Sequence, residues 1–215
     1  MGSSQFLTAK LAFSSDDDYS HSNVYSNRNQ SKNMIILDWD DTLMCTSFIL
    51  SRNKHLNSDE QSLVYQLGKK VERFLSFLKS IGQVIIITNS TRAWVKKTAQ
   101  NYLGLSSLIF KDIFLYSTRE RFSEQIPIEL WKREAYKEIE AKIKRCKCVI
   151  CIGDSVNDVE EGKKLKQSCP NIKVATVKFM EKPSDPHDII NEIDSVMKNF
   201  NNLINTDYNM YFDTN

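Results

Sequence analysis

The stretch "MIILDWDDTLMC", residues 34–45, places three aspartates directly behind an uninterrupted apolar run. The run predicts a buried strand, and on extended backbone Asp38 and Asp40 point to the same side, with Trp39 turned away. Carboxylates gathered in one place repel one another unless a cation or a proton relieves them. An Asx turn is the plainer explanation of Asp-Asp-Thr after a strand. The stretch therefore indicates either a local turn or the edge of a cation site.

Length and charge narrow the possible classes of protein. A chain of 215 residues suffices for one domain with tails and for a substantial core. Its 29 basic and 27 acidic residues leave a net charge of +2, which gives no overall field for nucleic acid, so we expect no nucleic-acid partner. No apolar run approaches the roughly 20 residues that a membrane span needs. Five cysteines, an odd count, and a start without a secretory signal predict a reducing, cytoplasmic setting.

Short apolar runs alternate with longer amphipathic runs along the middle of the chain. The apolar runs predict strands at 34–37, 84–88, 112–116, 148–152 and 172–177. The amphipathic runs predict helices at 59–80, 91–103, 129–145, 156–167 and about 189–200. This alternation predicts an α/β fold with a doubly wound parallel sheet of about five strands. We expect one domain over 33–200, a mobile polar N-terminal tail over 1–32 and a C-terminal tail over 201–215.

In such folds the functional site lies beyond the carboxyl ends of the strands. The second predicted strand ends in "VIIITNS", where Thr88 offers a hydroxyl and the amides of Asn89 and Ser90 open a helix. The N-terminus of a helix is a place where phosphate binds. A plain helix cap explains the same residues, so phosphate binding is a hypothesis at this point.

The fourth predicted strand leads into "CVICIGDSVNDVEEG", in which Asp158 follows Asp154 by one helical turn. Mg²⁺ prefers oxygen ligands and often takes only one or two carboxylates from a protein. Asp154 together with Asp38 therefore predicts a Mg²⁺ site that relieves the repulsion among the clustered acids. A helix cap is again the local alternative. Lys132, in "IELWKREAYKE", is by itself most simply a solvated charge on a helix.

In this order the motifs resemble those of the haloacid dehalogenase (HAD) superfamily of phosphohydrolases, over roughly residues 33–200. The four motifs of that family fall on residues 38–42 (D-x-D-x-T), Thr88, Lys132 and 153–158 (G-D-x-x-x-D). Response-regulator receiver domains use similar residue types, but there the lysine comes last, whereas here it precedes the final acid pair. A P-loop motif is absent from the sequence. The resemblance implies a Rossmann-like core of the HAD type.

The resemblance also implies a phosphatase reaction. Asp38 would attack a phosphate monoester and become an aspartyl-phosphate. Asp40 would protonate the leaving oxygen and then deprotonate the water that hydrolyses the intermediate. Thr88 and Lys132 would stabilise the transferring phosphoryl group.

The cofactor implied by the resemblance is Mg²⁺. It would bind the carboxylates of Asp38 and Asp154 and the backbone carbonyl of Asp40. Asp158 would hold a metal-bound water or orient Lys132. These residues are therefore the predicted metal site.

Other residues near the motifs are candidates for binding or for packing. Asn89 and Arg92, beside the Thr88 motif, are further candidates for binding phosphate. Asp41 stands where the family more commonly has glycine, and it adds a charge to the cluster. The pair Cys148 and Cys151 has zinc-knuckle spacing but lies inside a predicted buried strand, where cysteine behaves as a small hydrophobe. Packing is the simplest role for the three tryptophans, Trp39, Trp94 and Trp131.

The connections between the motifs are short. Only 45 residues separate Thr42 from Thr88, and 15 lie between Tyr116 and Lys132, which allows a flap but not a folded cap. An open site favours a phosphorylated substrate of large size, such as a phosphoprotein, and a small phosphorylated metabolite is the alternative. A non-catalytic interaction module with a HAD fold is the rival hypothesis from another class. The sequence leaves the oligomeric state open.

Overall fold

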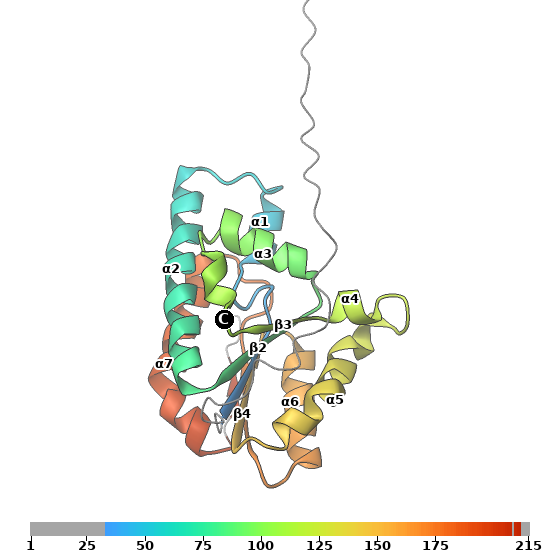
Figure 1. Ribbon diagram of the computed structural model, residues 1–215. Helices are drawn as coiled ribbons and strands as arrows, with labels where there is room; N and C mark the ends of the chain where they lie inside the picture. The colour runs from blue at the N-terminus through green and yellow to red at the C-terminus, as the bar shows by residue number, and fades with distance from the viewer. Residues whose placement is uncertain (1–32, 208, 212–215) are drawn as a thin grey trace, which may run out of the picture. The chain divides into compact units, whose positions relative to one another are not determined.

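The computed structural model describes residues 33–207 and 209–211. The described strands are β1 (Asn33–Leu37), β2 (Gln83–Thr88), β3 (Phe114–Ser117), β4 (Cys148–Gly153), β5 (Lys173–Lys178) and β6 (Asn209–Tyr211). They form one six-stranded sheet in the order β3-β2-β1-β4-β5-β6, and each neighbouring pair is parallel. The predicted α/β fold with a doubly wound parallel sheet is confirmed, with six strands in place of about five (Figure 1).

The order of the strands reverses between β1 and β4. From β1 the chain moves outward to β2 and β3, then returns to place β4 on the other edge of β1. Ile36 therefore has Ile85 as its partner on one side and Cys151 on the other. Ligands of doubly wound sheets bind at such a switch point, beyond the carboxyl ends of the strands.

Helices cover both faces of the sheet (Figure 1). Their bounds are α1 (Thr46–Ser51), α2 (Ser58–Ile81), α3 (Arg92–Asn101), α4 (Thr118–Phe122), α5 (Trp131–Ile143), α6 (Val156–Ser168) and α7 (Pro186–Asn205). Side chains alternate along β1, so Ile35 and Leu37 pack in the core that contains α2, α3 and α7. Met34 and Ile36 pack on the opposite face, against α5 and α6. Burial on both faces explains why the strands read as continuous apolar runs.

The structure differs from the prediction at several short elements. The stretch 43–57 contains the six-residue helix α1, and the segment before α5 contains α4 and a 3-10 turn, Ile128–Leu130. Strand β3 begins two residues later than predicted, because Asp112 has a left-handed backbone (φ 68°) that no strand accommodates. Neither connection holds a folded cap, as expected from their lengths.

The C-terminal stretch 201–215 is not wholly a tail. Helix α7 continues to Asn205 because Leu203 is fully buried, and β6 then pairs with β5. The predicted N-terminal tail, 1–32, lies outside the described residues. Within the part of the chain that the structure describes, no helix combines the length and apolar character needed to cross a bilayer.

Candidate active site

The turn after β1 holds the first acid at the switch point. The amide of Asp38 donates to the carbonyl of Ile152 (2.9 Å), which extends the pairing of β1 with β4 by one residue. The chain then folds back, and the amides of Leu43 and Met44 both donate to the carbonyl of Trp39. Asp38 is thereby fixed at the very end of the strand, with 8% of its surface exposed.

The backbone and the contacts of Asp41 explain why aspartate fits where the HAD family more commonly has glycine. Its backbone is left-handed (φ 52°), a conformation that favours glycine and is tolerated by aspartate. Its carboxylate accepts hydrogen bonds from the amide (2.8 Å) and hydroxyl (2.5 Å) of Ser47 in α1. Burial raises the pKa of Asp41 above its ordinary value. Asp41 thus stabilises the turn and the start of the flap segment.

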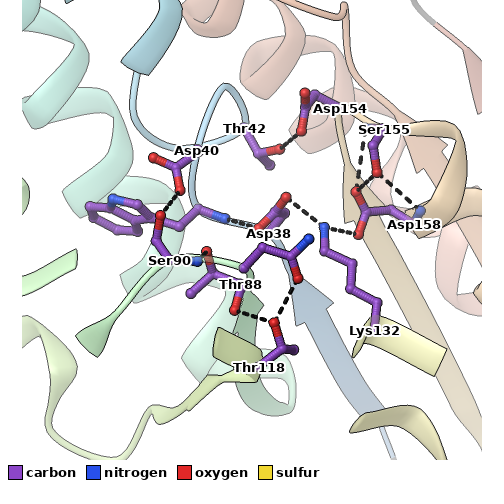
Figure 2. Close-up of polar contacts among 12 residues, drawn as sticks. Asp38, Asp40, Thr42, Thr88, Ser90, Thr118, Lys132, Asp154, Ser155 and Asp158 are labelled. Carbon is purple, nitrogen blue, oxygen red and sulfur yellow. Dashed lines mark hydrogen bonds and ion pairs between the residues drawn. The ribbon is translucent and has the colours of Figure 1, made fainter. Parts of the chain in front are cut away.

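Lys132 lies between two acids, Asp38 directly after β1 and Asp158 in the first turn of α6 (Figure 2). Its Nζ is 2.6 Å from Oδ2 of Asp38 and 2.5 Å from Oδ1 of Asp158, and 5% of the lysine is exposed. Burial alone lowers the pKa of Lys132, but the carboxylates of Asp158 and Asp38 more than offset this, so its pKa lies above the ordinary value. Burial raises the pKa of Asp38 to about 7, against the opposing charge of Lys132 and together with the repulsion from Asp158. The structure thus brings the predicted Lys132 directly to the predicted nucleophile.

The last motif shapes the place of Asp158. Ser155 is the N-cap of α6, and its hydroxyl donates to Oδ2 of Asp158 (2.6 Å), while the amide of Asp158 donates to Oγ of Ser155 (3.3 Å). A Cβ on Gly153 would collide with the Asp158 carboxylate, so glycine is required there by close approach. Asp158 therefore has both roles, because one of its oxygens takes part in the capping box of α6 and the other binds Lys132.

Three carboxylates form the predicted metal site. Ligand atoms of Asp38, Asp154 and Asp158 lie within 4.8 Å of one another. Burial and the neighbouring charges of Asp38 and Asp158 raise the pKa of Asp154 to about 8. Thr42 makes the single hydrogen bond that reaches the Asp154 carboxylate from a described residue, and it is long (3.4 Å). When the three acids are ionised, the single charge of Lys132 does not balance them, and such a set of oxygens fits Mg²⁺.

The end of β2 supplies the second motif. Thr88 is fully buried, and its Oγ1 accepts from the amide of Ser90 (3.1 Å). Thr118, at the start of α4, donates to the carbonyl of Thr88 (3.1 Å) and to Oδ1 of Asn89 (2.6 Å). Because Oδ1 of Asn89 is an acceptor here, the amide hydrogens of Asn89 are the donors left for a phosphate oxygen.

The structure does not bring every predicted residue to the acid cluster. The Arg92 guanidinium is half exposed and binds Glu120 of α4 (Nε to Oε2, 2.5 Å). The Asp40 carboxylate also lies apart from the three clustered acids, bound by Thr46, Ser90 and Trp94. A contribution of Asp40 to the metal through its backbone carbonyl stays a prediction.

Sequence reasoning missed the groups that hold these residues. Thr118 and Thr46 belong to helices too short to show periodicity, and Trp94 was assigned to packing. Each carries a side-chain donor to a motif residue, which lies 29 and 54 residues away for Thr118 and Trp94 and 6 residues away for Thr46. No sequence pattern reports such contacts. The pair Cys148 and Cys151 is buried in β4, as predicted for small apolar residues.

Comparison with known proteins gives a match to one family. A model described as haloacid dehalogenase-like hydrolase matches residues 62–166. No curated protein matches the sequence.

Several solved structures are weakly similar. The Legionella pneumophila effector Ceg4, crystallised with an N-terminal yeast Hog1p sequence, is 12% identical, covers 80% of this chain and 97% of its own, and has a TM-score of 0.44. YfnB from Bacillus subtilis, bound to magnesium, is 13% identical, covers 77% and 100%, and has a TM-score of 0.37. Cytosolic 5'-nucleotidase IIIB bound to cytidine is 10% identical, covers 85% and 81%, and has a TM-score of 0.37. Similarities this low carry no argument about the chain.

The family match can be placed on the structure. The matched segment holds Thr88, Lys132, Asp154 and Asp158, while Asp38 lies upstream on the strand that pairs with both β2 and β4. Four motifs that are scattered in sequence thus meet at one edge of the sheet, in the order that the family uses. The match over residues 62–166 and the meeting of these motifs together support membership of the haloacid dehalogenase superfamily of hydrolases.

Proposed function

We propose that this hydrolase is a Mg²⁺-dependent phosphatase that cleaves phosphate monoesters through an aspartyl-phosphate on Asp38. The observation that carries the proposal is the buried contact of Lys132 with Asp38 and Asp158, next to Asp154. Burying charged groups costs free energy, and apolar residues of similar size would stabilise the fold at least as well. The buried charges are therefore better explained by a function than by stability. Acids with perturbed pKa values, gathered where the strands of a parallel sheet end, are typical of catalytic sites.

The chain's own residues account for each step. Asp38 attacks phosphorus, the bond from phosphorus to the leaving oxygen breaks, and Asp40 gives that oxygen a proton. Water then attacks the aspartyl-phosphate, its proton returns to Asp40, and the bond to Asp38 breaks. Lys132 bears the positive charge beside the nucleophile. The buried hydroxyl of Thr88 and the amide of Asn89 bind phosphoryl oxygens.

Mg²⁺ belongs to this proposal as the cofactor. Asp38, Asp154 and Asp158 would hold it, with the carbonyl of Asp40, and it would supply positive charge that offsets both the acids and the phosphoryl group. Arg92 is proposed as a phosphate-binding residue only when its guanidinium leaves Glu120.

The proposed substrate is a phosphorylated molecule of large size, such as a phosphoprotein. Support comes from the connections that flank the site. They hold the short helices α1 and α4 and one 3-10 turn, with no folded cap, so the substrate itself would exclude water. A reducing cytoplasmic setting is part of the same proposal, and the five cysteines are unpaired thiols.

Hydrolysis of p-nitrophenyl phosphate by the purified protein, with Mg²⁺ and with EDTA, tests the reaction. We expect metal-dependent turnover that falls to background in Asp38→Asn. Asp112→Asn is the matched control, because it makes the same chemical change at an exposed loop position. A folded wild-type protein without turnover, and without a thermal shift from Mg²⁺ plus beryllofluoride, would instead establish the non-catalytic module.

The substrate class needs a second comparison. A phosphopeptide should have a higher kcat/KM than its free phosphoamino acid, since an open site leaves room for contacts beyond the phosphate. Equal values, or a preference for the small ester, would favour a phosphorylated metabolite.

A further inference from the structure

The Asp40 carboxylate is held by donors from three separate segments. Oδ1 accepts from Oγ1 of Thr46 at the start of α1 (2.6 Å) and from Nε1 of Trp94 in α3 (2.9 Å). Oδ2 accepts from Oγ of Ser90, just after β2 (2.6 Å; Figure 2). Ser90 and Trp94 lie 50 and 54 residues from Asp40, so tertiary structure rather than a local turn sets its orientation.

The two oxygens of Asp40 are not equivalent in this arrangement. Each carboxylate oxygen offers about two acceptor sites, and Oδ1 already has two donors whereas Oδ2 has one. The indole N–H of Trp94 can only donate, so it always occupies one acceptor site of Oδ1. A serine hydroxyl both donates and accepts, so the bond between Ser90 and Oδ2 can reverse when Oδ2 carries a hydrogen.

Trp94 is itself fixed in position. Its amide donates to Oγ1 of Thr91, the N-cap of α3, and its carbonyl accepts from Oγ1 of Thr98 (2.8 Å). The same Thr98 hydroxyl accepts from Nε1 of Trp39, the residue between the two motif aspartates (3.0 Å). Two indoles therefore tie α3 to the loop after β1, one in each direction. This double attachment sets where the Trp94 N–H points.

We propose that Trp94 and Thr46 are positioning residues that bind Oδ1 of Asp40 and so leave Oδ2 as its proton-transferring oxygen. The inference rests on the proposed phosphatase function. When the bond from phosphorus to the leaving oxygen breaks, the leaving oxygen takes the proton from Oδ2, and the attacking water later returns a proton to the same atom. A misplaced donor slows protonation of the leaving group because proton transfer needs hydrogen-bond distance.

Leaving-group dependence tests this role without relying on loss of activity alone. The quantity kcat/KM reports the first step, in which the leaving oxygen departs. Nitrophenolate departs without a proton, whereas the alkoxide of an alkyl phosphate needs one. We expect Trp94→Phe, which removes only the N–H and part of the ring, to lower kcat/KM for an alkyl phosphate by roughly tenfold more than for p-nitrophenyl phosphate.

The chain offers a matched control. Nε1 of Trp131 donates to the carbonyl of Ile126 (2.9 Å), away from Asp40, so Trp131→Phe removes an indole N–H of the same kind. We expect Trp131→Phe to change kcat/KM for both esters by the same factor. Equal losses in Trp94→Phe, or the same selective loss in Trp131→Phe, would overturn the inference.

A second pair of variants covers the case in which Trp94→Phe does not fold. Thr46→Val removes the other donor to Oδ1 and should show the same selective loss, while Thr46→Ser, which keeps the hydroxyl, should restore the wild-type ratio. An unchanged ratio in Thr46→Val counts against the inference.

Different results would overturn the phosphatase function and the positioning role of Trp94 and Thr46. Wild-type turnover that is absent, or that survives Asp38→Asn, removes the proposed function and this inference with it. Turnover that depends on Asp38 but shows no selective loss in the positioning variants overturns this inference alone.

Discussion

Lys132 shows most clearly what one residue does in this site. Its ammonium binds two carboxylates that the chain brings from β1 and from the start of α6, and neither partner is close to it in sequence. A buried ion pair is weak evidence for stability, but removing one partner leaves an uncompensated buried charge. The lysine therefore matters for the folded state as well as for the proposed reaction.

Lys132→Met should make the metal-free protein less stable. Asp38 and Asp158 would face each other without a cation, which we expect to lower the free energy of unfolding by roughly 3–5 kcal/mol. Urea denaturation in EDTA measures the effect. Lys137→Ala is the control, because its pair with Glu134 is exposed and should contribute at most about 0.5 kcal/mol. Equal losses of unfolding free energy in the two variants would show that the buried ion pairs of Lys132 contribute no more than the exposed pair of Lys137.

The pKa values of two acids in the predicted metal site predict how the free energy of unfolding depends on pH. The pKa values of Asp38 and Asp154 rise from 3.8 to about 7 and about 8, so between about pH 4 and pH 8 the folded protein retains protons that the unfolded chain has lost. The free energy of unfolding in EDTA should therefore fall as the pH rises through this range. Glu192, whose pKa burial raises to about 8, contributes to the same slope.

Asp154→Asn tests this assignment. We expect the variant to lose less stability than wild type as the pH rises, and so to melt at a higher temperature in EDTA at pH 8. We also expect Mg²⁺ to add no stability to the variant. Melting curves at pH 5, 6.5 and 8 give the answer, with the exposed Glu124→Gln as control. A variant that melts at a lower temperature than wild type in EDTA at pH 8 would contradict the prediction that Asp154 destabilises the metal-free protein at that pH.

The sequence predicted the catalytic candidates unevenly, for physical reasons. Lys132 was the weakest candidate, yet it shares a face of α5 with Ala135, Tyr136, Ile139 and Ile143, all buried. Helical spacing therefore contained the signal that separates it from the exposed Lys137. The partners of Asp40 had no such signal, because Trp94 and Ser90 reach it only through the packing of α3 on the sheet.

At the scale of elements, the long helices followed from their apolar spacing and the short ones did not. Helix α2 has Asn57 as its N-cap, in a capping box with Glu60, and buries a continuous apolar stripe, so the sequence pattern predicts it. Helix α1 has six residues, too few for a period to repeat, and an isolated helix of that length is unstable. It exists because Phe48 and Ile49 are buried in the core, which the sequence alone does not report.

Gly68 in α2 gives a test at this scale. Alanine is the better helix former by about 1 kcal/mol, so propensity predicts that Gly68→Ala stabilises the protein. A Cβ at this position would, however, overlap the backbone carbonyl of Leu103, which has no rotamer to escape into. We therefore expect a loss of roughly 1–3 kcal/mol in urea denaturation. Gln66→Ala, on the exposed face of the same helix, is the control, and a stabilised Gly68→Ala variant would disprove the close contact.

At the scale of the whole molecule, the parallel sheet and the core on both of its faces followed from the alternation of strands and helices. The order of the strands was not part of that prediction. The C-terminal boundary did not follow from the alternation, because β6 is three residues long and has no apolar run to mark it. Its neighbour Asp207 binds the amide of Val174 (2.9 Å) and Nζ of Lys166 (3.0 Å). The end of the described chain is thus attached to β5 and α6 by polar contacts that composition does not reveal.

Two truncated proteins test whether the domain ends at residue 200, as the sequence predicted, or further along the chain, as in the structure. Ending the chain after Asn205 removes β6 and the contacts of Asp207, which should cost about 1–2 kcal/mol and leave turnover unchanged. Ending it after Phe200 also removes Leu203, which is fully buried, and should cost at least roughly 2 kcal/mol more. Denaturation midpoints of the two proteins measure the difference. Equal midpoints would favour a domain that ends at residue 200.

The position of β1 has a consequence for the protein while the ribosome makes it. β1 pairs with β2 on one side and with β4 on the other, yet β4 begins only at Cys148, long after β2 and β3 have emerged. Until then the nascent chain presents the edge of an apolar strand, Met34 to Leu37, whose hydrogen-bonding groups have no partner. Such an edge recruits other chains, so synthesis passes through an interval of exposure to aggregation. Translation slowed between residues 117 and 148 should lengthen that interval and increase the fraction of chains that misassemble.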